Sequence, residues 1–185
     1  MSTEYLSASA ILPADGGYEP QRKTNFSLVM NIPGVGQGGR TLALSLDSVG
    51  EPKVSVERGE VKFGNQTRKY AGLPTTTIDQ IVFKDWVDKD VFNLLWQWWR
   101  KVYNARTGKI GSVEDYKVNA HLMKFGPDGD NVRVWELVGV WPSSVSGGTA
   151  EMGSSEQNKI TVVLEVDEIN YEGAAGGSAG GVSGL

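Results

Sequence analysis

The segment Tyr116–Trp141, YKVNAHLMKFGPDGDNVRVWELVGVW, carries the clearest structural pattern in the sequence. Every second residue from Tyr116 to Leu122 can face the same side of a strand, with polar residues between them. The turn-forming residues Gly126–Asn131 follow, and a second apolar run continues to Trp141. Two such runs joined by a glycine- and aspartate-rich turn are typical of a β-hairpin, so the segment predicts an antiparallel sheet.

Similar alternation predicts strands before and after this hairpin. The last of them loses its phase at Asp167-Glu168, which predicts a β-bulge before Ile169 and Tyr171. Weaker strand patterns lie in the segment between Asp47 and Thr76, which contains several glycines and charged residues. The further predicted strands are Phe26–Ile32, Leu42–Leu46, Lys53–Val56, Val61–Phe63, Thr76–Phe83 and Ile160–Val166.

One helix, predicted over about residues 88–105, interrupts the strands. Asp88 is its expected N-cap, and basic residues near its end suit the helix dipole. Its apolar arc is roughly 200° wide, about twice that of an ordinary surface helix. Either this helix is embedded deeply in its own domain, or Val91, Leu94 and Trp98 contact another subunit. Many strands and one helix predict an α+β or mainly β domain, built as a sandwich or barrel.

Length and composition indicate a single globular domain. The chain has 185 residues, a net charge of −4 and no cysteine, which excludes disulfides, thiolate metal sites and cysteine catalysis. No signal peptide or membrane span is expected, and the lack of a basic run disfavours tight DNA binding. We expect an N-terminal arm over residues 1–24, a folded domain over 25–172 and a flexible Gly/Ser/Ala-rich tail over 173–185.

The sequence offers little catalytic chemistry. Residues Gly34–Gly39 match the letters of a dinucleotide-binding fingerprint, which requires a helix immediately afterwards. A strand pattern follows instead, so a hairpin loop is expected. His121, the single histidine, lies on the polar side of its strand and is expected to face solvent or a pore. Glu165 and Asp167 are interpreted as a solvated acidic face rather than a glycosidase pair. No catalytic, cofactor-binding or metal-binding residue is predicted.

Six tryptophans are the other notable feature of the composition. Three lie on the predicted helix, at positions 96, 98 and 99. Core filling is one interpretation, and anchoring of subunit contacts, where aromatic residues are enriched, is the other. The sequence leaves both open.

Several ordered segments resemble the tail tube protein family of contractile-tailed bacteriophages. The strongest segment is Arg133–Leu137 with Gly139–Val145, and the resemblance covers about residues 25–172. Its specificity lies in the order of the segments along the chain rather than in any one of them. The others are Gly64-Asn65 with Arg68–Pro74, Phe83–Asp85, Asp88–Val91 leading into Trp98–Asn104, Thr107–Gly111, Tyr116-Lys117 and Asn158–Val162.

The resemblance implies two packed antiparallel sheets with one flanking helix, and six subunits in a ring whose inner sheets join into a continuous barrel. Stacked rings would form the hollow inner tube of a virion tail, assembled in the host bacterial cytoplasm. The implied partners are other copies of the chain, a contractile sheath, a baseplate hub or initiator, a tail terminator and a tape measure protein. Genomic DNA would pass through the lumen without specific binding. Neither an enzymatic activity nor a cofactor is implied.

Two surfaces are candidates for assembly and for the lumen. The composition of the segment between Asp47 and Thr76 predicts that it projects to a neighbouring ring. Glu165 and Asp167 are candidate lumen residues because they lie on the polar face of a long strand. The candidates for contacts between subunits or rings are Gly64, Asn65, Arg68, Lys69, Tyr70, Val91, Leu94 and Trp98.

Other functions remain open at this point. The tube could belong to a contractile bacteriocin or to another injection or secretion particle. From a different class, a monomeric β-sandwich could bind carbohydrate or peptide through exposed tryptophans. A hydrolase is the weakest alternative, because no nucleophile or metal constellation is evident.

Overall fold

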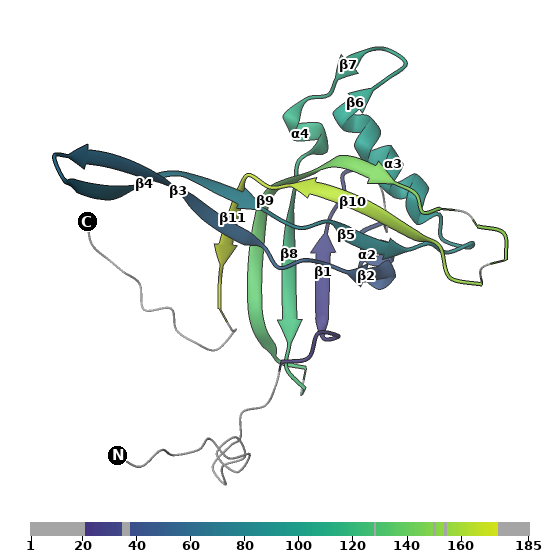
Figure 1. Cartoon of the computed structure of the whole chain (residues 1–185). Coiled ribbons are helices and arrows are strands. Elements are labelled where there is room, and N and C mark those ends of the chain that lie inside the picture. The colour runs from purple at the N-terminus through teal and green to yellow at the C-terminus, as the bar shows by residue number, and fades with distance from the viewer. Residues whose placement is uncertain (1–20, 35–37, 128, 150, 154, 174–185) are drawn as a thin grey trace, which may run out of the picture.

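A curled antiparallel sheet forms the body of the molecule, with one long hairpin projecting from it (Figure 1). The computed structural model describes residues 21–34, 38–127, 129–149, 151–153 and 155–173. The expected N-terminal arm and C-terminal tail fall mostly outside these described residues. The prediction of a mainly β domain with antiparallel sheets is confirmed.

The main sheet has the strand order β1-β8-β9-β10-β5-β2, with β11 also paired to β9, and all its pairs are antiparallel. The elements are β1 (Phe26–Met30), α2 (Gly38–Ser45), β2 (Leu46–Ser48), β3 (Lys53–Phe63), β4 (Gln66–Thr77), β5 (Ile81–Lys84), α3 (Val91–Val102), β6 (Tyr103–Asn104), β7 (Lys109–Ile110), α4 (Val113–Tyr116), β8 (Val118–Phe125), β9 (Asn131–Ser146), β10 (Lys159–Glu165) and β11 (Glu168–Tyr171).

Strand β9 curls the sheet. Its first part pairs with β8 and β11, and its last part pairs with β10. Gly139, which has a positive φ of 68°, lies near the end of the first part, and the pairing of the last part with β10 contains a register shift between Ser144 and Pro142. Bulges and glycines bend strands, so one long strand can belong to two layers.

The expected β8–β9 hairpin is confirmed, and its register explains the core. Ala120 is paired with Leu137, and Leu122 with Trp135, so these side chains share one face. The apolar side chains of β1, β5 and β10 meet them, and α3 covers the cluster with Val91, Leu95 and Trp98. The other core residues are Leu28, Met30, Ile32, Leu42, Ile78, Ile81, Phe83, Val118, Val140, Ile160, Val162, Leu164 and Val166.

The strand predicted over Leu42–Leu46 is wrong, because this segment forms helix α2. Leu42 is buried, whereas Leu44 is 74% exposed. The helix lies close to β1 because Gly39 has no side chain: an added Cβ would lie 2.4 Å from the carbonyl oxygen of Met30. Leucine and alanine are good helix formers, which favours a helix here. The helix has only eight residues, too few to show a helical period, so the alternation of its leucines with other residues looked like a strand pattern.

The predicted bulge after β10 is a complete break between two strands. Strand β10 pairs with residues 141–146 of β9, whereas β11 pairs with residues 135–138. Asp167, in the link between them, donates its backbone N–H to the carbonyl oxygen of Val138 at 3.1 Å. The chain therefore moves from one layer to the other at this point. A bulge and such a change of layer both interrupt the apolar alternation, so the sequence alone does not distinguish them.

Helix α3 begins later than predicted. Asp90, not Asp88, is the N-cap, and its Oδ1 accepts a hydrogen bond from the backbone N–H of Asn93 at 2.9 Å. Tyr116 ends the short helix α4 instead of starting the strand that follows. None of the helices in the described part of the chain is long and apolar enough to cross a membrane.

Candidate functional site: a projecting hairpin and two free sheet edges

The β3–β4 hairpin extends away from the body of the molecule (Figure 1). Of its strand residues, only Gly59 and Thr76 are partly covered, and all the others are exposed. A strand of 11 residues reaches about 35 Å, so the hairpin extends far from the core. Its projection fits the expectation from composition, while its contact with a neighbouring ring stays a prediction.

A bulge divides this hairpin into two halves whose apolar faces differ. Val56 is paired with Pro74 and Arg58 with Ala71, which leaves two residues of β4 opposite one residue of β3. Near the body, the apolar side chains stand at even positions of β3, such as Val56; near the tip they stand at odd positions, such as Phe63. Because successive side chains of a strand point to opposite sides, the exposed apolar surface changes sides along the hairpin.

Near the tip, one face of the hairpin is aromatic and apolar. Gly59, Val61 and Phe63 are paired with Tyr70, Arg68 and Gln66, respectively, so all six positions share this face. We call it the tip face. The Tyr70 ring lies over Gly59, where an added Cβ would be 2.3 Å from the tyrosine Cζ. Phe63 is 80% exposed.

The five ring-stacking candidates from the sequence therefore do not form a single surface. Arg68 and Tyr70 lie on the tip face, whereas Lys69 is paired with Glu60 on the opposite face. Gly64, with a positive φ of 57°, and Asn65 form the turn at the end of the hairpin. A two-residue turn of this kind favours glycine and asparagine.

Polar contacts anchor the hairpin at its base. The Thr76 hydroxyl donates to the carbonyl oxygen of Val166 at 2.9 Å. The carboxylate of Glu51, two residues before β3, forms ion pairs with Lys124 and Arg133 on the sheet. The hydrogen bond from Lys124 lowers the pKa of Glu51 below its ordinary value of 4.5, and the nearby charges act in the same direction.

We expect this anchor to weaken in acid. A carboxylate whose pKa is lowered by folding adds stability above its ordinary pKa, and this stability is lost as the pH falls through the lowered value. Glu51→Gln should therefore cost about 0.5 kcal/mol at pH 7, because the pair is half exposed, and should cost progressively less below pH 4.5. Thermal unfolding from pH 7 to pH 3 measures the difference. An equal cost at both ends of the range would contradict this role.

Helix α3 is embedded in its own domain, which resolves the alternative that the sequence left open. Val91 and Trp98 have 0% exposure, so the expectation that they contact another subunit is corrected; Leu94 is partly buried against the core. The Trp98 indole N–H donates to the carbonyl oxygen of Tyr116 at 2.7 Å. The wide apolar arc is covered because α3 packs against β9 on one side and against α2 and α4 on others.

An aromatic ladder occupies another side of α3. The ring centroids of Phe92 and Trp96 are 5.7 Å apart, those of Trp96 and Trp99 are 5.0 Å apart, and Tyr103 meets Trp99 edge-on at 6.3 Å. Trp96 and Tyr103 remain 38% and 40% exposed. The sequence placed these residues in one apolar stripe but did not separate its buried side from its exposed side.

The two acidic lumen candidates differ in their surroundings. Asp167 accepts a hydrogen bond from Lys117 at 2.5 Å, and this ion pair balances its charge. Glu165 is exposed at the end of β10, where it is paired with Trp141. Their assignment to a lumen stays a prediction.

A four-stranded part of the sheet, β1-β8-β9-β11, has an open polar face that the sequence analysis did not single out. One row across it consists of Val29, His121, Glu136 and Asn170, in register. The Asn170 amide donates to Glu136 at 3.3 Å. His121 is exposed on this face, in agreement with its expected position. The alternating positions of these residues in three strands were the available signal.

The outer strands of this four-stranded part have free edges. Within the described residues, β1 is paired only with β8, and β11 only with β9. Since each neighbouring pair is antiparallel, β1 and β11 run in opposite directions. Strand β11 of one molecule can therefore pair with β1 of another in the same antiparallel sense. An unpaired edge is a template for such strand addition.

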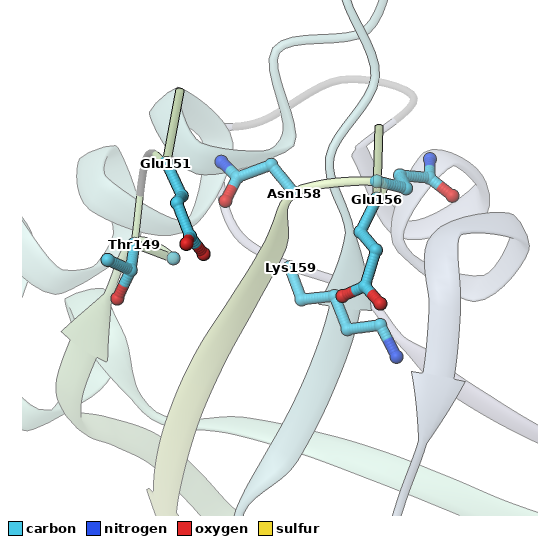
Figure 2. Close-up of a pocket in the computed structure, with 7 residues that line it drawn as sticks. Thr149, Glu151, Glu156, Asn158 and Lys159 are labelled. Atoms are coloured by element: carbon cyan, nitrogen blue, oxygen red, sulfur yellow. The ribbon is translucent and has the colours of Figure 1, made fainter. Parts of the chain in front are cut away.

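An open pocket of about 650 Å³ lies beside the loop between β9 and β10. Figure 2 shows Glu151 and Glu156 on either side of Asn158, with Lys159 nearby. The other lining residues are Gly148, Thr149 and Gln157. This lining is polar and has no tryptophan, so it does not match a sugar-binding surface built on aromatic rings. Among the described residues, no group of three or more potential metal ligands is present.

The glycine-rich segment Gly34–Gly39 is followed by helix α2, not by the expected strand. The expectation of a strand after these glycines, on which the exclusion of a nucleotide site depended, is therefore wrong. The topology still disagrees with a nucleotide site: α2 leads into β2, which pairs antiparallel with β5, whereas the fingerprint belongs to a parallel βαβ unit. Gly39 serves close packing of α2 on β1.

Solved structures share this fold. A chain from "an Extracellular Contractile Injection System, PVC sheath-tube complex in extended state" aligns with a TM-score of 0.63 and 15% identity, over 91% of this chain and 99% of the other. A chain of "the anti-feeding prophage cap (AFP tube terminating cap)" gives 0.65 and 13%, over 84% and 93%. A chain of the anti-feeding prophage baseplate gives 0.60 and 14%, over 84% and 97%.

Sequence comparison defines the family. No curated protein matches the chain in sequence. Residues 22–174, however, match the family described as T4-like virus tail tube protein gp19, and this span contains the curled sheet, the projecting hairpin and the embedded helix. The chain therefore belongs to the T4-like virus tail tube protein family.

Proposed function

We propose that this chain is the subunit of the inner tail tube of a contractile phage tail. Six copies would form a ring, and stacked rings would form a hollow conduit for DNA. The chain acts as a structural component of the virion and not as an enzyme, and it is assembled in the host cytoplasm. Family membership supports a tube subunit, and the free edges of β1 and β11 support assembly in closed rings.

The two free edges carry this proposal. Pairing of β11 with β1 of the next copy would continue the antiparallel order of the four-stranded part without a change of direction. Each added copy would hide one edge of each neighbour, and closure of the ring would hide all of them. The polar row with His121, Glu136 and Asn170 would then repeat around one surface of the barrel.

That surface is the lumen in our proposal, together with the candidates Glu165 and Asp167. The chain carries a net charge of −4, which would keep a polyanion such as DNA from binding to the wall. A sheath, a baseplate hub or initiator, a tail terminator and a tape measure protein are the proposed partners. The solved structures that share the fold include a sheath–tube complex, a tube cap and a baseplate, which supports the first three.

A second candidate is the tube of an injection particle that carries no genome. The fold is shared with chains of such particles over most of both chains, and this observation favours it. The content of purified particles distinguishes the two functions. Nuclease-protected DNA in particles that contain this subunit would support the phage tail, and its absence would support the injection particle.

Electron microscopy of the purified, concentrated protein tests the assembly. We expect rings with sixfold symmetry and stacked hollow tubes in negative stain. If the protein stays monomeric, the measurement is repeated after coexpression with the baseplate initiator, which can act as a template. Monomers in both cases, together with a change in tryptophan fluorescence on adding a carbohydrate or peptide, would favour a binding module instead.

A further inference from the structure

We propose that the ion pair between Lys117 and Asp167 is a latch that holds strand β11 in the position from which its free edge can pair with another copy. The two residues are positioning residues, because they act through β11. This inference rests on the proposed tube function, in which β11 joins β1 of the next subunit, and it names what fixes that edge in place.

Strand β11 is weakly held by its own contacts. It has only four residues, Glu168–Tyr171, and none of them is fully buried. Within the described residues it is paired only with β9, and Ile169 is its one side chain that packs against the core cluster. A short strand with few buried contacts lies at the low end of local stability. Its position therefore depends on how the preceding link is fixed.

The link Val166–Asp167 joins the core to this strand. Val166 is 7% exposed and belongs to the core cluster, whereas the side chain of Asp167 is 53% exposed. The Thr76 hydroxyl at the base of the hairpin donates to the Val166 carbonyl at 2.9 Å, where the hairpin leaves the body (Figure 1). The Asp167 backbone N–H donates to the Val138 carbonyl at 3.1 Å. The side chain of Asp167 is then the last point of attachment before β11 begins.

Lys117 holds this side chain. Its Nζ donates to Oδ2 of Asp167 at 2.5 Å, and a charge-assisted hydrogen bond of this kind is stronger than a neutral one. Lys117 is itself fixed, since it is the C-cap of α4 and its backbone N–H donates to the Val113 carbonyl at 3.0 Å. The preceding residue, Tyr116, accepts the indole hydrogen bond of the buried Trp98. The ion pair therefore connects the start of β11 to the core helix α3.

Gly139 of β9 leaves room for the latch. A Cβ added to Gly139 would lie 2.2 Å from Oδ2 of Asp167, the oxygen that Lys117 binds. The Gly139 backbone N–H donates to Oδ1 of Asn119 at 3.3 Å, which holds this part of β9 against β8. The bend of β9 and the carboxylate of the latch thus occupy the same place, and a side chain there would displace the carboxylate.

The charges around the link make the lysine necessary. Residues 165–168 are Glu-Val-Asp-Glu, three acidic residues in four, and like charges at this spacing repel one another. Lys117 places a positive charge against this run. Removing it would break the bond to Asp167 and would also leave the repulsion between the carboxylates unopposed. Both effects would release the start of β11 from its position.

Hydrogen exchange of the monomer measures the position of β11. In Lys117→Met, we expect the amides of residues 167–172 to exchange about threefold faster, a modest factor because the ion pair is partly exposed. The amides of β8 and β10 should exchange as in the unchanged protein. Lys117→Arg keeps the positive charge and should keep β11 protected.

Lys159→Met is the matched control. It removes the ion pair between Lys159 and Asp47 at 2.8 Å, whose side-chain exposures of 56% and 21% resemble the 25% and 53% of Lys117 and Asp167. Lys159 lies at the start of β10, at the opposite end of that strand from the link. Exchange of residues 167–172 should therefore not change in this variant.

Sedimentation of assembled tubes gives a second measurement. Lys117→Met should lower the yield of tubes by about tenfold, because β11 must be in position in every subunit of a ring and the effect multiplies around it. Adding Asp167→Asn to Lys117→Met should cause no further loss, since two groups that act as a unit are not additive. Lys117→Arg and Lys159→Met should assemble normally.

The outcomes separate the latch from the proposed function. Tubes from the unchanged protein, with neither faster exchange of β11 nor loss of tubes in Lys117→Met, would overturn the latch and leave the tube function in place. Faster exchange throughout β8 and β10, an equal effect of Lys159→Met, or faster exchange of β11 with full tube formation would also overturn it. If the unchanged protein forms no tubes, even with the baseplate initiator, the tube function is contradicted, while faster exchange confined to β11 in Lys117→Met would still support the latch.

Discussion

Replacing Trp98 with alanine is expected to lower the free energy of unfolding by about 3–5 kcal/mol, the usual cost of removing a large buried aromatic side chain. The indole has 0% exposure and packs in the centre of the core cluster. Its removal would leave a cavity that the surrounding sheet and helices cannot fill. It would also leave the Tyr116 carbonyl oxygen without the indole donor that it now has at 2.7 Å.

Chemical denaturation of the monomer at neutral pH measures this effect. Trp96→Ala is the matched control, because Trp96 lies on the same helix but is 38% exposed. It should cost no more than about 1 kcal/mol, mainly through the lost stacking with Phe92 and Trp99. If the two substitutions had equal effects on stability, or if Trp98→Ala impaired only assembly, the burial of Trp98 would not be its main role.

Removal of the hairpin tip should have the opposite profile, with a large effect on assembly and a small effect on stability. Arg58 and Ala71 are paired in register, so an Asn-Gly turn can replace Gly59–Tyr70 between them. The deleted residues are exposed or nearly so, and none belongs to the core cluster. We expect no tubes and a change in the free energy of unfolding of less than about 1 kcal/mol, within the range of surface changes.

The matched control shortens another exposed turn. Asn104 and Lys109 are paired at the end of the β6–β7 hairpin, so Asn-Gly can replace residues 105–108 there. Tube formation should survive this change. Electron microscopy and sedimentation report assembly, and thermal unfolding reports the fold. Tubes of unchanged length after removal of residues 59–70 would refute the role of the hairpin in joining subunits.

The secondary structure predicted from the sequence was most accurate where the local alternation of apolar residues coincides with their burial in the fold. In β8 the apolar residues Val118, Ala120 and Leu122 recur every second residue and meet the core together with Trp135 and Leu137 of β9, so the hairpin is correctly placed. Helix α3 was also found, because its stripe is long enough to show a helical period. Helix α2 was missed because it is only eight residues long and its leucines alternate by chance.

The candidate surfaces were harder to predict, for a physical reason. Exposure depends on what distant segments cover, not on the side chain itself. Val91 and Trp98 looked like a free apolar surface on a wide arc, yet α2, α4 and β9 surround the helix. Conversely, Phe63 lies in a weak strand pattern and is 80% exposed, because no part of the body that the structure describes covers the hairpin tip.

The amino-acid sequence by itself determined the mainly β class, the central β8–β9 hairpin, the single long helix and the resemblance to tail tube proteins, because these follow from local periodicity and the order of segments. Only the tertiary structure decided that β10 and β11 lie in different layers, that Trp98 is buried and that the hairpin carries its aromatic face at the tip. These features arise from pairing between residues far apart in the chain and, in the hairpin, from a register that places Tyr70 on the same face as Val61 and Phe63.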